Sequence, residues 1–348
     1  MGIVTTHIVQ GDQVAMQNAV VEFAKKFSNR DNFNLAVEEL AKECRDQNQY
    51  DMSELVYKTV KDTLPNSTHR DGGIWWAVAS ITSDIAVGND SEAELAVDSL
   101  IADFNDHPEL AQGVLEIGLK YYRKGRLLLG TDNDKEVKNY YRKAINVWER
   151  IIYRLPRSAV TARACYVTAV CYSQELGEYI TGIGYFQMIV NNWPDYQYAW
   201  HAQYFVGMYY SKLRNMGVLT AEKADPLIEN AYKGVLEKYP ESKSAVSAAL
   251  NLATMSSSKG LLHDAANYYE IYLKKETNDN NLSKALKKVY GLGQRAEKEG
   301  AFSNAMELYG LVTVFARDID DSLVSKARDR AAKSLEAIES SLILKKVQ

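Results

Sequence analysis

The small and large apolar residues of this chain recur at fixed distances from its prolines. Five of the six prolines stand at the end of similar short sequence motifs, and each of these five lies 38 to 48 residues from the next. A large apolar residue stands eight positions before each of these prolines, and a residue that is usually small stands four positions further back. The large residues are Tyr57, Leu100, Trp148, Phe186 and Tyr232. This spacing predicts a helix that buries one face and ends where proline disfavours helical geometry in the preceding residue.

A second helix is predicted ahead of each of these helices. Its mark is a small residue followed seven positions later by Gly or Asn, which suit a left-handed turn between helices. The pairs are Ala41 with Asn48, Gly118 with Gly125, Ala253 with Gly260, and Gly293 with Gly300. We call the two helices of a repeat helix A and helix B. The small residues predict that helix A approaches helix B closely.

These paired helices resemble the tetratricopeptide repeat family. The clearest copy consists of Val289-Tyr290-Gly291-Leu292-Gly293, Ala296, Gly300, Phe302, Ala305 and Tyr309, and Asn34 to Ser67 is another. Seven copies in register cover nearly the whole chain. The resemblance implies an all-α fold, a right-handed superhelical solenoid of about seven helix-turn-helix repeats.

The repeats divide the chain into an array with two caps. We place them at about 34–67, 72–110, 111–158, 159–196, 197–242, 243–278 and 282–320. Residues 1–33 are an N-terminal segment with a lone helix B, which is either a capping helix or half of a repeat. Residues 34–320 are the array, and residues 321–348 predict a polar-faced closing helix, which a solenoid needs as a soluble end. Extra residues near Gly88 and in 126–139 and 213–223 predict longer helices or loops there.

A partner-binding surface follows from the resemblance. In the family, helix A lines the concave side, and its exposed stripe falls three before, one after and four after the small residue, which is one face of a helix. The resemblance implies a groove lined by Trp76, Leu115, Leu119, Tyr122, Tyr204, Met208 and Tyr290. Flanking charges such as Glu38, Arg45 and Lys298 would select the partner. The alternative is that curvature or the extra residues bury these side chains as core.

Composition excludes several classes of function. Hydrophobic residues make up 46% and charged residues 25% of the 348, which is too apolar for a disordered chain. The net charge is −4 with no basic stripe, so nucleic acid is not an expected partner. The sequence has no apolar run long enough for a transmembrane segment, and residues 1–12 lack the features of a signal peptide.

The sequence offers no set of residues for catalysis, a cofactor or a metal. Cys44, Cys165 and Cys171 form neither a disulfide framework nor a metal cluster, and we expect buried thiols. The histidines are isolated from one another and are His7, His69, His107, His201 and His263. Asp132, Asp134 and Glu136 imitate a calcium loop, but Val137 stands where that loop needs Gly.

The leading hypothesis is a non-enzymatic scaffold or adaptor that binds a protein or peptide in the groove. The endings Trp193-Pro194-Asp195-Tyr196 and Tyr239-Pro240-Glu241-Ser242 resemble those of bacterial envelope repeat proteins of the outer-membrane assembly lipoprotein and polysaccharide-export types. That likeness implies the periplasm if an export signal was removed, and the cytoplasm is expected otherwise. The first alternative is a glycan-handling or envelope-assembly scaffold with a polysaccharide partner. A helical-toroid enzyme is disfavoured, because the repeats place no acid at equivalent positions.

Overall fold

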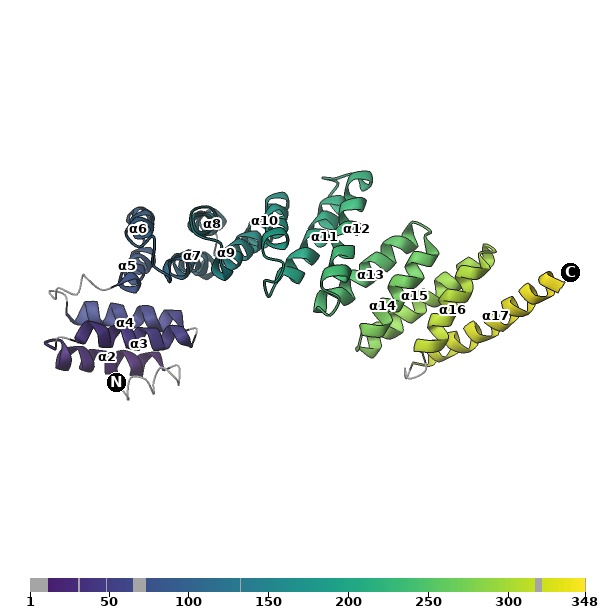
Figure 1. Cartoon of the computed structure of the whole chain (residues 1–348), viewed down its shortest axis with the longest axis horizontal. Helices are drawn as coiled ribbons and strands as arrows, with labels where there is room; N and C mark the ends of the chain where they lie inside the picture. Colours follow the sequence, from purple (N-terminus) through teal and green to yellow (C-terminus); the bar gives the residue numbers. More distant parts are fainter. Residues whose placement is uncertain are drawn as a thin grey trace. The chain divides into compact units, whose positions relative to one another are not determined.

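The computed structural model describes residues 12–30, 32–47, 49–64, 73–131, 133–316 and 321–347, the last range without the side chains of 323 and 341–347. The regular elements in these ranges are all helices (Figure 1). The contacts divide the chain into two compact units, Met1–Tyr185 and Phe186–Gln348, which we call the N-terminal unit and the C-terminal unit. Among the described helices, none combines the length and apolar character that crossing a bilayer requires.

The described part of the N-terminal unit has a single helix followed by helical pairs. Its elements are α2 (Gln13–Phe27), α3 (Phe33–Asp46), α4 (Tyr50–Thr63), α5 (Ile74–Val87), α6 (Asp90–Asp103), α7 (Leu110–Leu127), α8 (Asp134–Arg154), α9 (Ala159–Val170) and the π-helix η2 (Cys171–Glu175). Helix α10 (Tyr179–Asn192) crosses the boundary between the units. Helices α3 with α4, α5 with α6, and α7 with α8 pack as pairs.

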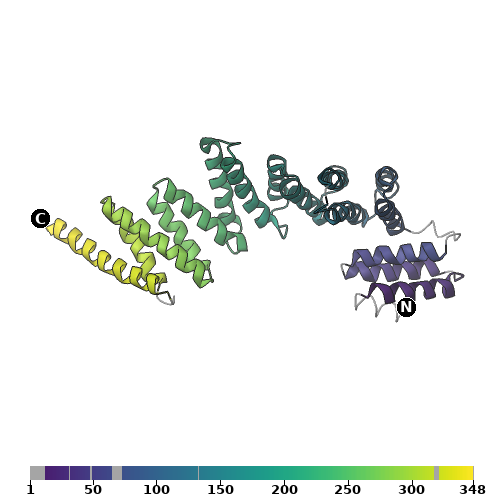
Figure 2. The same ribbon diagram turned by 180° about the vertical axis from the view of Figure 1, so that it is seen from behind.

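After the end of α10, the described residues of the C-terminal unit form three helical pairs and a closing helix. Its elements are α11 (Ala199–Asn215), α12 (Ala221–Lys238), α13 (Lys243–Ser258), α14 (Leu262–Lys275), α15 (Asp279–Lys298), α16 (Phe302–Phe315) and α17 (Ser322–Val347). The pairs are again consecutive, and each lies side by side in Figure 2 as well as in Figure 1. The predicted all-α fold of sequentially paired helices is therefore confirmed.

The close approach of helix A to helix B depends on glycines that face aromatic rings. A Cβ atom on Gly118 would lie 2.2 Å from Nε1 of Trp148, and one on Gly293 would lie 2.7 Å from Cε1 of Tyr309. Both rings are about 1% exposed, so they have no open space into which to move. The same contact joins Gly207 of α11 to Tyr232 of α12. Each ring fills the space that the missing side chain leaves, and the helix pair closes around it.

The turns between paired helices follow the prediction in two of the three described cases. Gly260 and Gly300 adopt φ values of 75° and 76°, the left-handed region in which glycine avoids a steric penalty. The prediction for Gly125 is wrong. Helix α7 continues to Leu127, and Gly125 is a buried helical residue against the ring of Tyr141. The extra residues lengthen α7 and α8 to 18 and 21 residues. Asn48 lies outside the described residues.

The fourth repeat departs from regular geometry where its sequence departs from the pattern. Val170 stands at a position where a small residue is expected, and α9 ends there in the π-helical turn η2. A Cβ atom on Gly182 would lie 1.9 Å from Oγ of Ser173 and 3.0 Å from the carbonyl oxygen of Ala169. Gly182 thus packs against Ser173 of the π turn and against the backbone of Ala169.

Candidate functional site

The first position of the helix A stripe lies at the boundary between core and surface. It is buried at Leu115 and half-buried in the other six of the seven predicted repeats, at Glu38, Trp76, Val167, Tyr204, Leu250 and Tyr290. The second position is exposed in four repeats, at Lys42, Ser80, Thr254 and Gln294, half-buried at Leu119 and Met208, and buried at Cys171. Helix A therefore presents a partly open face in both units.

In the N-terminal unit, the half-buried stripe residues rest on aromatic rings of the core. Trp76 of α5 packs on Tyr57 with 4.8 Å between ring centroids. Tyr122 of α7 lies 5.4 Å from the ring of Tyr141, and its hydroxyl donates to Glu175 Oε1 at 2.6 Å. Leu119 is half-buried against the same core. These three residues have one side fixed by packing and another open to solvent.

In the C-terminal unit, the stripe residues have the same arrangement. Tyr204 packs on Tyr232 with 5.4 Å between ring centroids, and its hydroxyl accepts a hydrogen bond from Asn251 at 3.4 Å. Tyr290 packs on Tyr309 at 5.9 Å. Met208 is half-buried. Tyr232 and Tyr309 each face a glycine on one side, and the rings of Tyr204 and Tyr290 cover their other side. Packing therefore fixes the orientation of Tyr204 and Tyr290.

Three predicted stripe residues, Leu115, Arg45 and Cys171, are buried and cannot contact a partner in this structure. Leu115 is 0% exposed, because α7 packs against α5, α8 and α9 and its residues 113–118 are all buried. Arg45 is 6% exposed, and its guanidinium donates to Glu38 Oε1 at 2.6 Å and to the Tyr57 hydroxyl at 3.1 Å. The half-buried Glu38, whose side chain is 34% exposed, thus neutralises Arg45, and the guanidinium of Arg45 is not presented to a partner.

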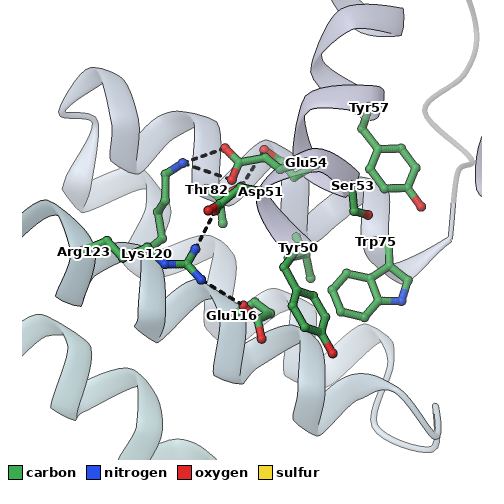
Figure 3. Close-up of a pocket in the computed structure, with 12 residues that line it drawn as sticks. Tyr50, Asp51, Ser53, Glu54, Tyr57, Trp75, Thr82, Glu116, Lys120 and Arg123 are labelled. Atoms are coloured by element: carbon green, nitrogen blue, oxygen red, sulfur yellow. Dashed lines mark hydrogen bonds and ion pairs between the residues drawn. The ribbon is translucent and has the colours of Figure 1, made fainter. Parts of the chain in front are cut away.

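A narrow cleft opens beside the stripe of the N-terminal unit, between α4, α5 and α7 (Figure 3). Tyr50 and Trp75 form an aromatic wall with 6.2 Å between ring centroids. Ion pairs form the charged part of its lining. Their members are Lys120 with Glu54, 2.9 Å between Nζ and Oε1, and Arg123 with Asp51, 2.6 Å between Nη1 and Oδ1. The enclosed space is about 20 Å³, enough for about one water molecule.

Glu116 of α7 is the buried acid of this cleft. It is 5% exposed, and its Oε1 accepts a hydrogen bond from Gln112 at 2.8 Å. Its Oε2 has no hydrogen-bond partner and lies 3.8 Å from Nη2 of Arg123. Burial raises the pKa of this carboxyl from 4.5 to about 7, against the opposing charges of Arg123 and Arg163. The carboxyl group of Glu116 therefore changes between its protonated and ionised forms near neutral pH.

The cleft was not predicted from the sequence, because the residues that line it lie on a different side of each helix from the predicted stripe. Trp75 and Glu116 each neighbour a predicted stripe position, Trp76 and Leu115. A carboxylate in the otherwise apolar run Val114-Leu115-Glu116-Ile117 was the available signal, since a buried acid is rarely without a role. The residues that share the cleft with Glu116 could not be predicted, because Tyr50 and Asp51 lie more than 60 positions earlier in the chain.

The remaining candidate residues fall outside the cleft. Cys44, Cys165 and Cys171 are all 0% exposed, as expected. Burial raises the thiol pKa of Cys44 to about 11 and that of Cys165 to about 12. No group of three or more potential metal ligands occurs within the described part of the chain. His7, His69 and Asp132 lie outside it.

The chain was compared with protein-family models, curated proteins and solved structures. No protein-family model matches the chain, and no curated protein matches its sequence. Among solved structures, it is similar to one described as the crystal structure of PilW, a widely conserved type IV pilus biogenesis factor. The TM-score is 0.35 at 13% sequence identity, and the match covers 72% of this chain and 96% of that chain.

Proposed function

We propose that the protein is a non-enzymatic scaffold of tetratricopeptide-like repeats that binds a protein partner through the open faces of its A helices. The observation that carries this proposal is the half-burial of the first stripe position in six of seven repeats. Three of these six residues, Trp76, Tyr204 and Tyr290, are aromatic, and aromatic residues held this way lose little conformational entropy on binding and offer a large apolar area. Fixed, partly open rings are therefore well suited to anchor a partner.

The proposal assigns each unit its own contact face. In the N-terminal unit, the face consists of Trp76, Leu119 and Tyr122. In the C-terminal unit, it consists of Tyr204, Met208 and Tyr290. Leu115 is not part of either face, because it is buried. The exposed second positions Ser80, Thr254 and Gln294 are polar and give a partner room to approach.

The test blocks the face without touching the core. Thr254→Arg with Gln294→Arg places two large cations at exposed positions of the A helices α13 and α15. Asn267→Arg with Val314→Arg is the matched control, with the same added charge at exposed positions of the B helices α14 and α16. In affinity capture from the native organism, we expect the first pair to lose a partner that the control pair retains. Equal capture by both variants would refute a contact face on the A helices of the C-terminal unit.

The same design applies to the N-terminal unit. Ser80→Arg on α5 lies on the proposed face, and Leu95→Arg on α6 is its control at a residue that is 73% exposed. Loss with the first variant alone would assign part of the contact to this unit. Circular dichroism of all variants should give the wild-type helix content, because none of the substituted side chains is buried.

A further inference from the structure

The cleft between α4, α5 and α7 contains an acid whose hydrogen bonds are incomplete. Glu116 is 5% exposed, and its Oε2 has no hydrogen-bond partner. The 3.8 Å to Arg123 Nη2 is too long for a hydrogen bond. A buried carboxylate oxygen without a hydrogen-bond donor has lost its hydration, and only the more distant charges of Arg123 and Arg163 compensate it, so a donor that enters the cleft recovers part of that loss.

The charged side chains that line the cleft include one more negative group than positive groups. Lys120 is paired with Glu54 and Arg123 with Asp51. Glu116 is the remaining charged group of the lining, and Arg163 of α9 acts on it from outside the lining. A single positive charge in the cleft would therefore balance the ionised form of Glu116.

The wall and the size of the cleft restrict what that cation can be. The faces of aromatic rings such as Tyr50 attract cations, while Trp75 already carries the Arg45 guanidinium 4.4 Å from its ring. The cavity of about 20 Å³ has room for a group the size of one water molecule. A primary ammonium group is that compact and has three donors, whereas the guanidinium group is a wider planar fork.

We propose that this cleft binds the ammonium group of a lysine side chain of the partner, with Glu116 as its counter-ion and Tyr50 as its aromatic wall. This rests on the proposed scaffold function, since it names a chemical feature of the partner. The cleft opens beside the stripe of α5 and α7, so a chain lying on the N-terminal face could insert a lysine there.

The proposal is tested with n-butylammonium, which has the length and head group of a lysine side chain. The full chain labelled with ¹⁵N is titrated at pH 7.5, and the indole N–H signal of Trp75, assigned with Trp75→Phe, is followed. We expect a saturable shift with n-butylammonium, and at least tenfold weaker binding of n-butylguanidinium and n-butanol. No saturable shift would mean that the cleft holds only water, and equal binding of the guanidinium compound would remove the size argument.

Substitution of the counter-ion gives the second arm. Glu116→Gln keeps the shape of the side chain and should weaken n-butylammonium binding at least tenfold. Glu94→Gln on α6 is the matched control, since Glu94 pairs with Lys143 outside the cleft and should bind the probe as wild type does. Equal weakening by both variants would point to a general charge effect and overturn the proposal.

Proton release gives a signature that a purely structural role of Glu116 would not produce. The carboxyl exchanges its proton near pH 7, and a bound cation favours its ionised form. Calorimetric titrations in two buffers of different ionisation enthalpy should show proton release at pH 7 in wild type and none in Glu116→Gln. None of these probes requires the partner. Failure here thus leaves the scaffold proposal standing, and failure of the capture experiment leaves the cleft result unchanged.

Discussion

Two glycines of α15, two positions apart, give a direct test of how the helical pairs hold together. Gly291 is exposed, and a Cβ atom built on it meets nothing within 4 Å. A Cβ atom on Gly293 would lie 2.7 Å from Cε1 and 2.8 Å from Cδ1 of Tyr309. Both variants to Ala gain about 1 kcal/mol of helix propensity, so their difference isolates the contact with the ring.

The size of that difference follows from the packing. An ordinary carbon contact is about 3.5–4.0 Å, so the ring of Tyr309 would have to move by about 1 Å. Tyr309 is 1% exposed, and its hydroxyl donates to Glu297 at 2.5 Å, which leaves the ring no room. Overpacking of this kind costs about 1–3 kcal/mol. We expect Gly291→Ala to be more stable than wild type and Gly293→Ala to be about 1–3 kcal/mol less stable than Gly291→Ala.

Urea denaturation followed by circular dichroism measures both variants, with hydrogen exchange of the α15 and α16 amides to locate the effect in this pair. Equal stability of the two variants would refute the reasoning, because the ring would then have space that the structure does not give it. A loss of stability at Gly291 would equally contradict the open surroundings of that residue.

Two further predictions concern buried groups. Glu116→Gln should leave stability unchanged near pH 4 and raise it by about 3 kcal/mol at pH 8. The reason is that the raised pKa of about 7, against 4.5 for an ordinary Glu, makes the folded state lose stability as pH rises through this interval. A pH-independent effect in urea denaturation would contradict it. Because burial raises the pKa of their thiols, Cys44, Cys165 and Cys171 should resist a thiol reagent at pH 8 in the native protein and react fully in denaturant, and fast native labelling would show that the core opens.

The helical pairs could be predicted from sequence because their determinants are local. Small and large residues a helical turn apart fix which side of a helix is buried, and Gly293 with Tyr309 shows that the pairing of such positions is correct. Gly125 was assigned wrongly because the same local pattern does not say how far α7 continues. The extra residues after Gly125 extend α7, so Gly125 lies within the helix and packs against the ring of Tyr141.

The candidate site could be predicted only in part. The stripe rule assumes that helix A has one open side, which holds for Tyr204 and Tyr290 but fails at Leu115, where α7 is covered by three other helices. Glu116 has its unusual environment for the same reason. How many neighbours surround a residue is decided by contacts distant in the sequence, and no spacing within one helix contains that information.

Site-specific photo-crosslinking tests the central claim most directly. A benzoylphenylalanine is placed at Gln294 on the face of helix A or at Val314 on the face of helix B, both exposed, and the protein is irradiated in the cells from which it comes. We expect a discrete crosslinked protein partner from position 294 that is absent from position 314. The same partner captured from position 314 but not from position 294 would place the contact on the B helices and contradict the account.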